Sequence, residues 1–205
     1  MSTAAVASGS SAAGEDSQGE DWQAEDWQGD WISPGGVDLQ INGGLGLAFP
    51  ELQDADLPTL LALLERLWQD GVEAICPTIV TCASSDLRRA LTVLAEARRQ
   101  HRPGRCRLLG AHLEGPFLEP SRRGAHPAQH LAAASPEALQ ERIAGFEREI
   151  ALLTLAPELP GALALCRQLS AEGVVVCLGH SAASEQQAQA GFEAGVRMLT
   201  HAFNA

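Results

Sequence analysis

Short apolar runs alternate with amphipathic segments from Ser33 to the end of the chain, and this alternation constrains the fold more than any other feature. The runs have the length of strands, and the segments between them carry apolar residues at helical spacing. Such alternation predicts an α/β fold with parallel strands and right-handed crossovers. The expected strands are 37–41, 74–81, 108–113, 150–155, 174–178 and 196–200.

Helices are expected between these strands, with cap and stop residues at their ends. They are a helix from Leu57 that Gly71 ends, one capped by Ser84 or Ser85 that runs to about Gln100, one from about Pro136, one over 162–171 before Gly173, and one between Ser184 and Gly195. Six strands of this kind fit an open doubly wound sheet or part of a (β/α)₈ barrel. The chain has no G-x-G-x-x-G in its first βα loop and no P-loop, so the choice rests on its polar residues.

One carboxylate and two imidazoles follow the ends of three expected strands: Glu114, His180 and His201. Parallel α/β folds build their sites at this end of the sheet. A Glu-His-His set that leaves a fourth position open suits a catalytic Zn²⁺, which lowers the pKa of a bound water to ~7. A single Glu or His at a strand end is more often a hydrogen-bonded loop residue, so the metal hypothesis depends on all three together.

In order and spacing, several stretches of the sequence resemble the N-acetylglucosamine-6-phosphate deacetylases, a family of the amidohydrolase superfamily. The stretches are Pro34–Gly43, His112–Phe117, Leu155–Glu158, Gly179–Ser181 and Thr200–Ala205. The resemblance covers residues 34–205 and favours the barrel over the open sheet. It implies that residues 33–205 form an incomplete TIM-type (β/α) barrel with about six of its eight β-α units.

The resemblance also implies a metal site, with Glu114, His180 and His201 as the ligands of one divalent ion, expected to be Zn²⁺. Gln40 and Asn42 occupy the place where many amidohydrolases have H-x-H and bind a second metal. Neutral amides are poor zinc ligands compared with imidazole, so one metal is expected. The chain contains no lysine, and therefore it lacks the carboxylated lysine that bridges two metals in some amidohydrolases. Gln40 and Asn42 are expected in the pocket or in purely structural roles.

The implied reaction is hydrolysis of the N-acetyl group of N-acetylglucosamine 6-phosphate, an amino-sugar phosphate, to glucosamine 6-phosphate and acetate. The family pattern places Ala125, His126, Asn204 and Ala205 at the substrate, with His126 polarising the acetyl carbonyl. His112, two residues before Glu114, is expected to support the ligands from the same face. The pair Arg122 and Arg123 would assist with phosphate or simply be solvated.

No catalytic base is identified, because in this superfamily the base is an aspartate at the end of strand eight, and only six strands are expected before residue 205. We therefore expect the chain to be truncated, to bind metal weakly and to deacetylate poorly by itself. Six parallel strands leave two free edges, so aggregation, a homo-oligomer or a complementing chain is expected. Two alternatives stay open: another amidohydrolase acting on a related amide, and a non-catalytic remnant of the deacetylase.

Composition excludes several other functions. The formal net charge of −12 argues against a nucleic-acid partner, because such a chain repels phosphates. The sequence has no apolar stretch long enough for a membrane span and no secretory signal, so a cytoplasmic protein is expected. Its five cysteines form no C-x-x-C pair and are expected to be buried thiols. Residues 1–32 are acidic and poor in apolar area, which predicts a disordered tail.

Overall fold

Parallel strands form the centre of the computed structural model, which describes residues 33–202. The order across the main sheet is β1-β4-β6-β7-β8-β9, and β5 also pairs with β4. The bounds are β1 Gly36–Ile41, β4 Val72–Val80, β5 Arg107–Leu108, β6 Ala111–Glu114, β7 Ile150–Leu155, β8 Val175–Leu178 and β9 Val196–Leu199. Successive strands along the chain are spatial neighbours and parallel, so the predicted α/β organisation is confirmed.

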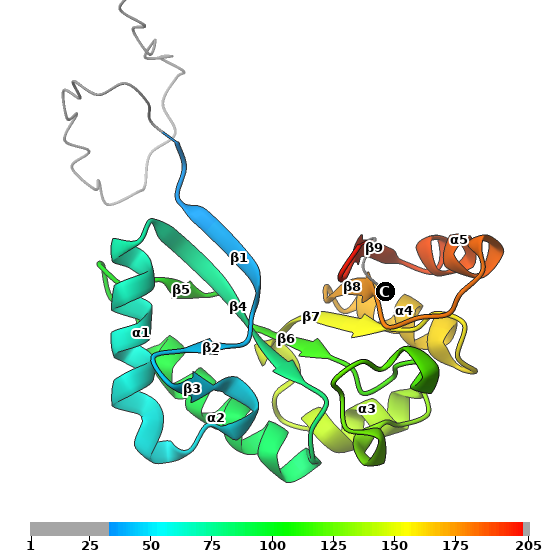
Figure 1. Cartoon of the computed structure of the whole chain (residues 1–205), viewed down its shortest axis with the longest axis horizontal. Helices are drawn as coiled ribbons and strands as arrows, with labels where there is room; N and C mark the ends of the chain where they lie inside the picture. Colours follow the sequence, from blue (N-terminus) through cyan, green and yellow to red (C-terminus); the bar gives the residue numbers. More distant parts are fainter. Residues whose placement is uncertain (1–32, 203–205) are drawn as a thin grey trace, which may run out of the picture. The chain divides into compact units, whose positions relative to one another are not determined.

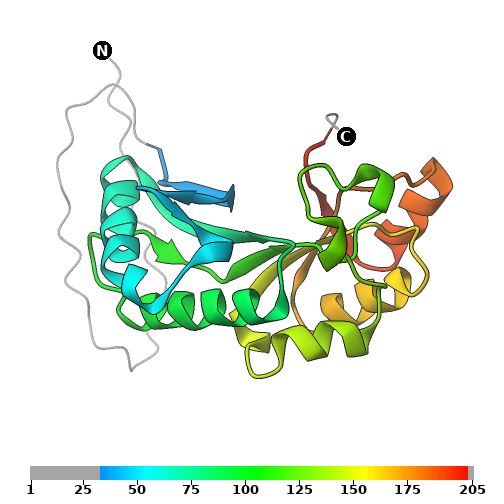
Figure 2. The ribbon, with the colours of Figure 1, turned by 60° about the horizontal axis from the view of Figure 1, so that its bottom comes forward.

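Five α-helices of the described residues lie between these strands. They are α1 Leu57–Gln69, α2 Ser84–Arg99, α3 Pro136–Ile143, α4 Ala162–Ala171 and α5 Glu185–Glu193. Figure 1 shows the sheet from β1 and β4 to β8 and β9, and Figure 2 shows α2 (green) and α3 (yellow-green) below it. The shorter elements are a hairpin of β2 Gly43–Gly44 with β3 Leu47–Ala48 and single 3₁₀ turns at Phe49–Glu51, Asp54–Asp56, Pro120–Arg122, Ala128–His130 and Glu147–Glu149.

Apolar side chains pack on both faces of the sheet, as is usual for parallel strands, although His112 and Thr154 are buried among them. The larger core lies between the strands and the helices, where Leu153 of β7 and Leu91 of α2 are fully buried. A smaller cluster on the opposite, concave face joins Cys76, Leu152 and Cys177. The sheet thus curls like part of a barrel wall, and within residues 33–202 its outermost strands, β1 and β9, each pair on one side only.

Helix caps differ from expectation at one of two positions. Ser184 caps α5 as predicted, because its side chain accepts a hydrogen bond from the backbone N–H of Gln187, whose side chain bonds back to the Ser184 N–H. The predicted Ser84 or Ser85 cap is wrong. Helix α2 begins at Ser84 itself, and Ala83 occupies the cap position without a side-chain hydrogen bond.

The expected strand 108–113 is also wrong as a single element, because it is divided into β5 and β6. Gly110 lies between them with φ +134°, a backbone conformation that favours glycine. A Cβ at Gly110 would lie 2.9 Å from the Cβ of Ala151. The close approach of this segment to β7 therefore needs a residue without a side chain, and apolar periodicity could not predict the break.

The described residues contain no helix with the length and apolar character that a membrane crossing demands. The predicted disordered tail, residues 1–32, lies outside the described residues.

Candidate metal centre

The predicted ligands meet at one carboxylate oxygen. Glu114 ends β6 and is 2% exposed. Its Oε1 lies 2.7 Å from His180 Nε2 and 2.9 Å from His201 Nε2. Its Oε2 accepts a hydrogen bond of 3.0 Å from the side-chain amide of Gln40 in β1. The structure therefore brings together residues that are up to 87 positions apart, from the ends of β1, β6, β8 and β9.

His180 is held from several sides. Its Nδ1 lies 3.0 Å from the carbonyl oxygen of Arg122, which can only accept, so Nδ1 carries the proton of this bond. A neutral ring then has its lone pair on Nε2, facing the Glu114 carboxylate. Two lone pairs 2.7 Å apart repel unless a proton or a metal ion lies between them. In agreement, the hydrogen bond with Glu114 raises the pKa of His180.

Glu114 is ionised despite its burial. Burial raises its pKa, but hydrogen bonding with the neighbouring imidazoles and with Gln40 outweighs this effect and leaves the pKa well below its usual range. The site thus contains a buried negative charge surrounded by donors. A buried carboxylate that faces several imidazoles is a favourable place for a divalent cation.

A third histidine joins the cluster. His126 is 5% exposed, and its Nε2 lies 3.8 Å from Glu114 Oε1. One ligand atom from each of Glu114, His126 and His180 lies within 4.8 Å of the others, which forms a group able to hold a metal. The imidazole of His201 is more open, with 43% of its side chain exposed. Sequence reasoning assigned His126 to the substrate, and its closeness to the ligands is new.

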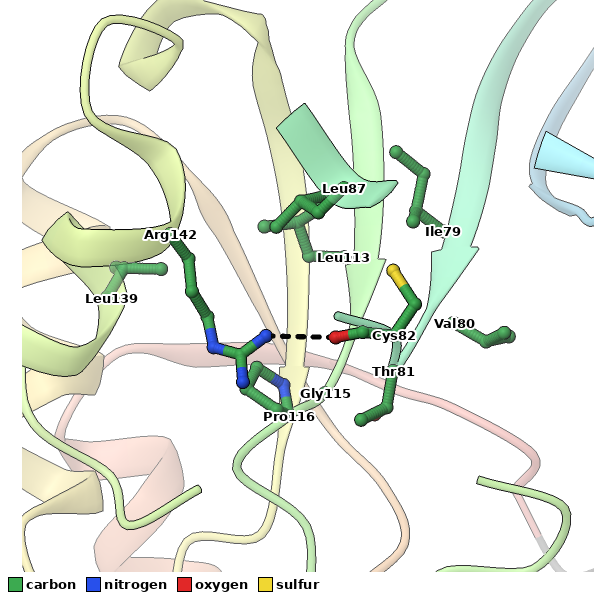
Figure 3. A pocket seen from close by; sticks show the side chains of 10 residues that line it. All are labelled: Ile79, Val80, Thr81, Cys82, Leu87, Leu113, Gly115, Pro116, Leu139 and Arg142. Atoms are coloured by element: carbon green, nitrogen blue, oxygen red, sulfur yellow. Dashed lines mark hydrogen bonds between the residues drawn. The ribbon is translucent and has the colours of Figure 1, made fainter. Parts of the chain in front are cut away.

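Thr81, the residue after β4, holds His126 in place. The backbone N–H of Thr81 points at His126 Nδ1 over 3.3 Å, and its Oγ1 lies 2.9 Å from the same atom. Thr81 Oγ1 also lies 3.1 Å from the Glu114 carbonyl oxygen. Arg142 of α3 supports the segment that follows Thr81. Its guanidinium donates to the carbonyl oxygens of Cys82 (Figure 3) and His130 over 3.1 Å each.

Two of the predicted ligands have an unusual backbone. His180 has φ +50° and His201 has φ +55°, in the left-handed region that costs an L-residue about 1–2 kcal/mol. Each stands two residues beyond the last residue of a strand, β8 or β9. Non-glycine residues in this conformation concentrate at functional sites, because the surrounding structure must hold them there.

Glu158, in the loop after β7, was not assigned a role from the sequence, although it belongs to the Leu155–Glu158 stretch. Its carboxylate accepts 2.6 Å hydrogen bonds from Ser181 Oγ and from the Ala182 backbone N–H. Both donors come directly after His180. The acidic side chain therefore anchors the turn that presents this imidazole.

The remaining predicted site residues differ in how firmly the structure holds them. Ala125 is exposed in the loop before His126, and Asn42 is exposed with no side-chain hydrogen bond inside residues 33–202. Arg123 donates to the His126 carbonyl over 2.7 Å, so it supports the loop. Asn204 and Ala205 lie outside the described residues. His112 lies beneath Glu114, buried on the concave side.

The donor set, one carboxylate with neighbouring imidazoles, fits one divalent cation. Two ligands about 2.0–2.2 Å from the same tetrahedral zinc ion lie about 3.4 Å apart. The distances from Glu114 Oε1 to Nε2 of His180 and of His201, 2.7 and 2.9 Å, are about 0.5–0.7 Å shorter than that value, so a bound ion would move these atoms apart by that amount. The proton on His180 Nδ1 is held by a backbone carbonyl, the usual arrangement for an imidazole that binds metal through Nε2.

Comparison with known proteins also finds deacetylases of amino-sugar phosphates. No family model matches the chain. The N-acetylglucosamine-6-phosphate deacetylase of Bos taurus is 37% identical over 178 residues, covering 85% of this chain and 42% of the relative. The N-acetylgalactosamine-6-phosphate deacetylase of Escherichia coli O157:H7 is 36% identical over 84% of this chain and 45% of its own length.

Among solved structures, a mutant of the Mycobacterium smegmatis N-acetyl-D-glucosamine-6-phosphate deacetylase in complex with N-acetyl-D-glucosamine-6-phosphate matches with a TM-score of 0.72 and 33% identity. The match covers 83% of this chain and 43% of that structure. The chain thus spans less than half the length of the proteins that it matches. By sequence and by fold, this chain is related to the N-acetylglucosamine-6-phosphate deacetylases and resembles less than half of such an enzyme.

Proposed function

We propose that this chain provides the metal-binding strands of a deacetylase that hydrolyses the N-acetyl group of N-acetylglucosamine 6-phosphate, releasing glucosamine 6-phosphate and acetate. The observation that carries the proposal is the meeting of Glu114, His180 and His201 from three strand ends. It occurs in a chain whose relatives are deacetylases of amino-sugar phosphates over 84–85% of its length. The sugar phosphate in the M. smegmatis complex supports this class of substrate.

Glu114, His180 and His201 would hold one divalent cation, Zn²⁺, with His126 beside them. When bound, such a cation supplies Lewis-acid polarisation of a carbonyl and lowers the pKa of water. The neutral side chain of Gln40, which donates to Glu114 Oε2, leaves no imidazole on β1 for a second cation. The chain's own part is to hold the Glu114 carboxylate ionised and to keep a proton of His180 on Nδ1, so that Nε2 faces the cation.

The Nε2–H of His126 would donate a hydrogen bond to the acetyl carbonyl oxygen. The N–H and Oγ1 of Thr81 both contact Nδ1, so Nε2 is the ring nitrogen available to a substrate. This nitrogen faces the cluster, 3.8 Å from Glu114 Oε1. A fixed donor beside the reacting carbonyl stabilises negative charge that develops on its oxygen.

The loop between Glu119 and His126 would form the sugar side of the site, with exposed Ala125 at the substrate. Arg122 is exposed and would be available for the phosphate, whereas the guanidinium of Arg123 donates a hydrogen bond to the His126 carbonyl oxygen. Asn204 and Ala205 are further proposed substrate contacts.

A chimeric enzyme tests the proposal. Residues 34–205 would replace the matching segment of the bovine deacetylase, and acetate release from N-acetylglucosamine 6-phosphate would be measured. We expect zinc-dependent release, abolished by Glu114→Gln, and little or none from the 205-residue chain alone. Zinc binding is also measured with the unmodified chain. If the chimera is inactive but the unmodified chain binds zinc, the chimera has misfolded. If the unmodified chain binds no zinc, the proposal is contradicted.

The 6-phosphate of N-acetylgalactosamine is a second candidate substrate, favoured by the E. coli relative at 36% identity. The two sugars differ in one hydroxyl configuration and share the acetyl group and the phosphate. The same chimera assayed with both sugars, each with and without phosphate, decides between them. A higher kcat/KM for the galacto sugar would replace the first assignment.

A further inference from the structure

A line of buried hydrogen bonds lies one layer beneath the metal centre. His112 Nε2 is 2.7 Å from Thr154 Oγ1, and Thr154 Oγ1 is 2.8 Å from Thr200 Oγ1. On its other side, His112 Nδ1 is 3.2 Å from the Leu39 carbonyl oxygen. We call Leu39, His112, Thr154 and Thr200 the polar ladder. It crosses from β1 through β6 and β7 to the end of β9.

Three of the four ladder residues are one or two positions from a residue of the centre. Leu39 precedes Gln40, His112 stands two before Glu114, and Thr200 precedes His201.

Gly179, which precedes His180, packs on the ladder as well. A Cβ at Gly179 would lie 2.8 Å from Thr200 Cβ and 2.9 Å from Thr154 Cγ2. The positions of Gln40, Glu114, His180 and His201 therefore depend on the same layer.

The donor and the acceptor of each hydrogen bond in the ladder follow from the carbonyl group at its first residue, Leu39. The Leu39 carbonyl only accepts, so His112 Nδ1 carries a proton. The Nε2 atom of the neutral ring then accepts from the Thr154 hydroxyl, whose oxygen accepts from Thr200. Thr154 is fully buried and His112 is 2% exposed. His112 has no access to water, so removing the middle hydroxyl leaves its Nε2 without a partner.

We propose that the polar ladder sets the spacing of the strand ends, and that Thr154 is a positioning residue for the metal ligands although it touches none of them by a side-chain hydrogen bond. The inference rests on the proposed function only in taking the cluster to bind zinc. Hydrogen-bonding partners behind metal ligands commonly change metal affinity by about 10–100-fold.

The test compares three variants of the full chain. Thr154→Val keeps the shape and removes the hydroxyl, Thr154→Ser keeps the hydroxyl, and Leu153→Val disturbs the same strand on its helix-covered face. Zinc affinity is measured by competition with a chromophoric chelator, and the Co²⁺ absorption spectrum reports ligand geometry. Backbone hydrogen exchange without metal follows peptides that cover 38–42, 112–115, 178–182 and 198–202.

We expect Thr154→Val to lower zinc affinity about tenfold or more, to change the Co²⁺ bands, and to speed exchange in those peptides. Thr154→Ser should stay within about threefold of the parent, and Leu153→Val should leave the Co²⁺ bands unchanged. If Thr154→Val does not fold, Thr200→Val at the half-buried end of the ladder takes its place, with the same expectations.

Parent-like affinity and exchange in Thr154→Val, or equal losses in Leu153→Val, would overturn the ladder's role. A parent chain that binds no zinc contradicts the proposed function. Hydrogen exchange alone then tests whether the ladder sets the spacing of the strand ends.

Discussion

Gly179→Ala should destabilise the chain because there is no room for a methyl group. The new Cβ would meet Thr200 Cβ at 2.8 Å and Thr154 Cγ2 at 2.9 Å, about 1 Å closer than ordinary carbon contacts. Threonine is branched at Cβ and stiff at χ1, so neither neighbour can rotate away and the strands must separate. Overpacking of this kind costs about 1–3 kcal/mol in the free energy of unfolding. At roughly 2–4 °C per kcal/mol for a chain of this length, the melting temperature falls by about 2–12 °C.

Calorimetry of the metal-free chain measures this loss, with Gly36→Ala as the matched control. A Cβ at Gly36 has no neighbour closer than 3.6 Å, and its φ is not positive, so stability should change by less than about 0.5 kcal/mol. Thr154→Ser deletes the methyl group that the new Cβ meets, so the double variant should lose less than the sum of the single losses. Equal melting temperatures for Gly179→Ala and Gly36→Ala would refute the reasoning.

Three further outcomes are expected. Glu158→Ala should lower zinc affinity about tenfold by releasing Ser181 and Ala182, with Glu158→Gln intermediate, and a parent-like titration of both would contradict this. Burial raises the pKa of Cys76, Cys106 and Cys166 from 9.0 to about 11. At pH 8 their thiolate fraction, and with it their rate of reaction with a thiol reagent, should therefore be about a hundredfold lower in the folded chain than in the unfolded chain. Equal rates in the two states would show that these thiols are accessible. Zinc at 100 times its Kd should raise the free energy of unfolding by about 2.7 kcal/mol in denaturant titrations, and a chelator should reverse the gain.

The sequence was sufficient for the features that depend on local patterns. Apolar runs and helical spacing predicted the parallel strands, and β7 and α4 have the predicted bounds. The ends of parallel strands lie at one edge of a sheet, so Glu114, His180 and His201 could be expected to meet. The Ser184 cap followed from its position before a helix, with Gln187 three residues later.

Features that depend on the register between distant strands could not be predicted. The Thr81–His126 contact joins residues 45 positions apart, and Thr154–Thr200 joins residues 46 apart. A threonine within an apolar strand gives no sign of its partner, because its role depends on which residues stand opposite. Glu158 was visible as part of a family stretch, but only the fold shows that its carboxylate holds the turn after His180. Gly110 divides a strand for the same reason, through its closeness to Ala151.

Zinc K-edge X-ray absorption of the zinc-loaded chain tests the central claim most directly. We predict one zinc ion per chain with only nitrogen and oxygen ligands at about 2.0–2.2 Å, including the scattering pattern of at least two imidazoles, and loss of this pattern in Glu114→Gln. Sulfur at about 2.3 Å, or a shell of water oxygens without imidazole, would mean that Glu114, His180 and His201 do not bind a common ion.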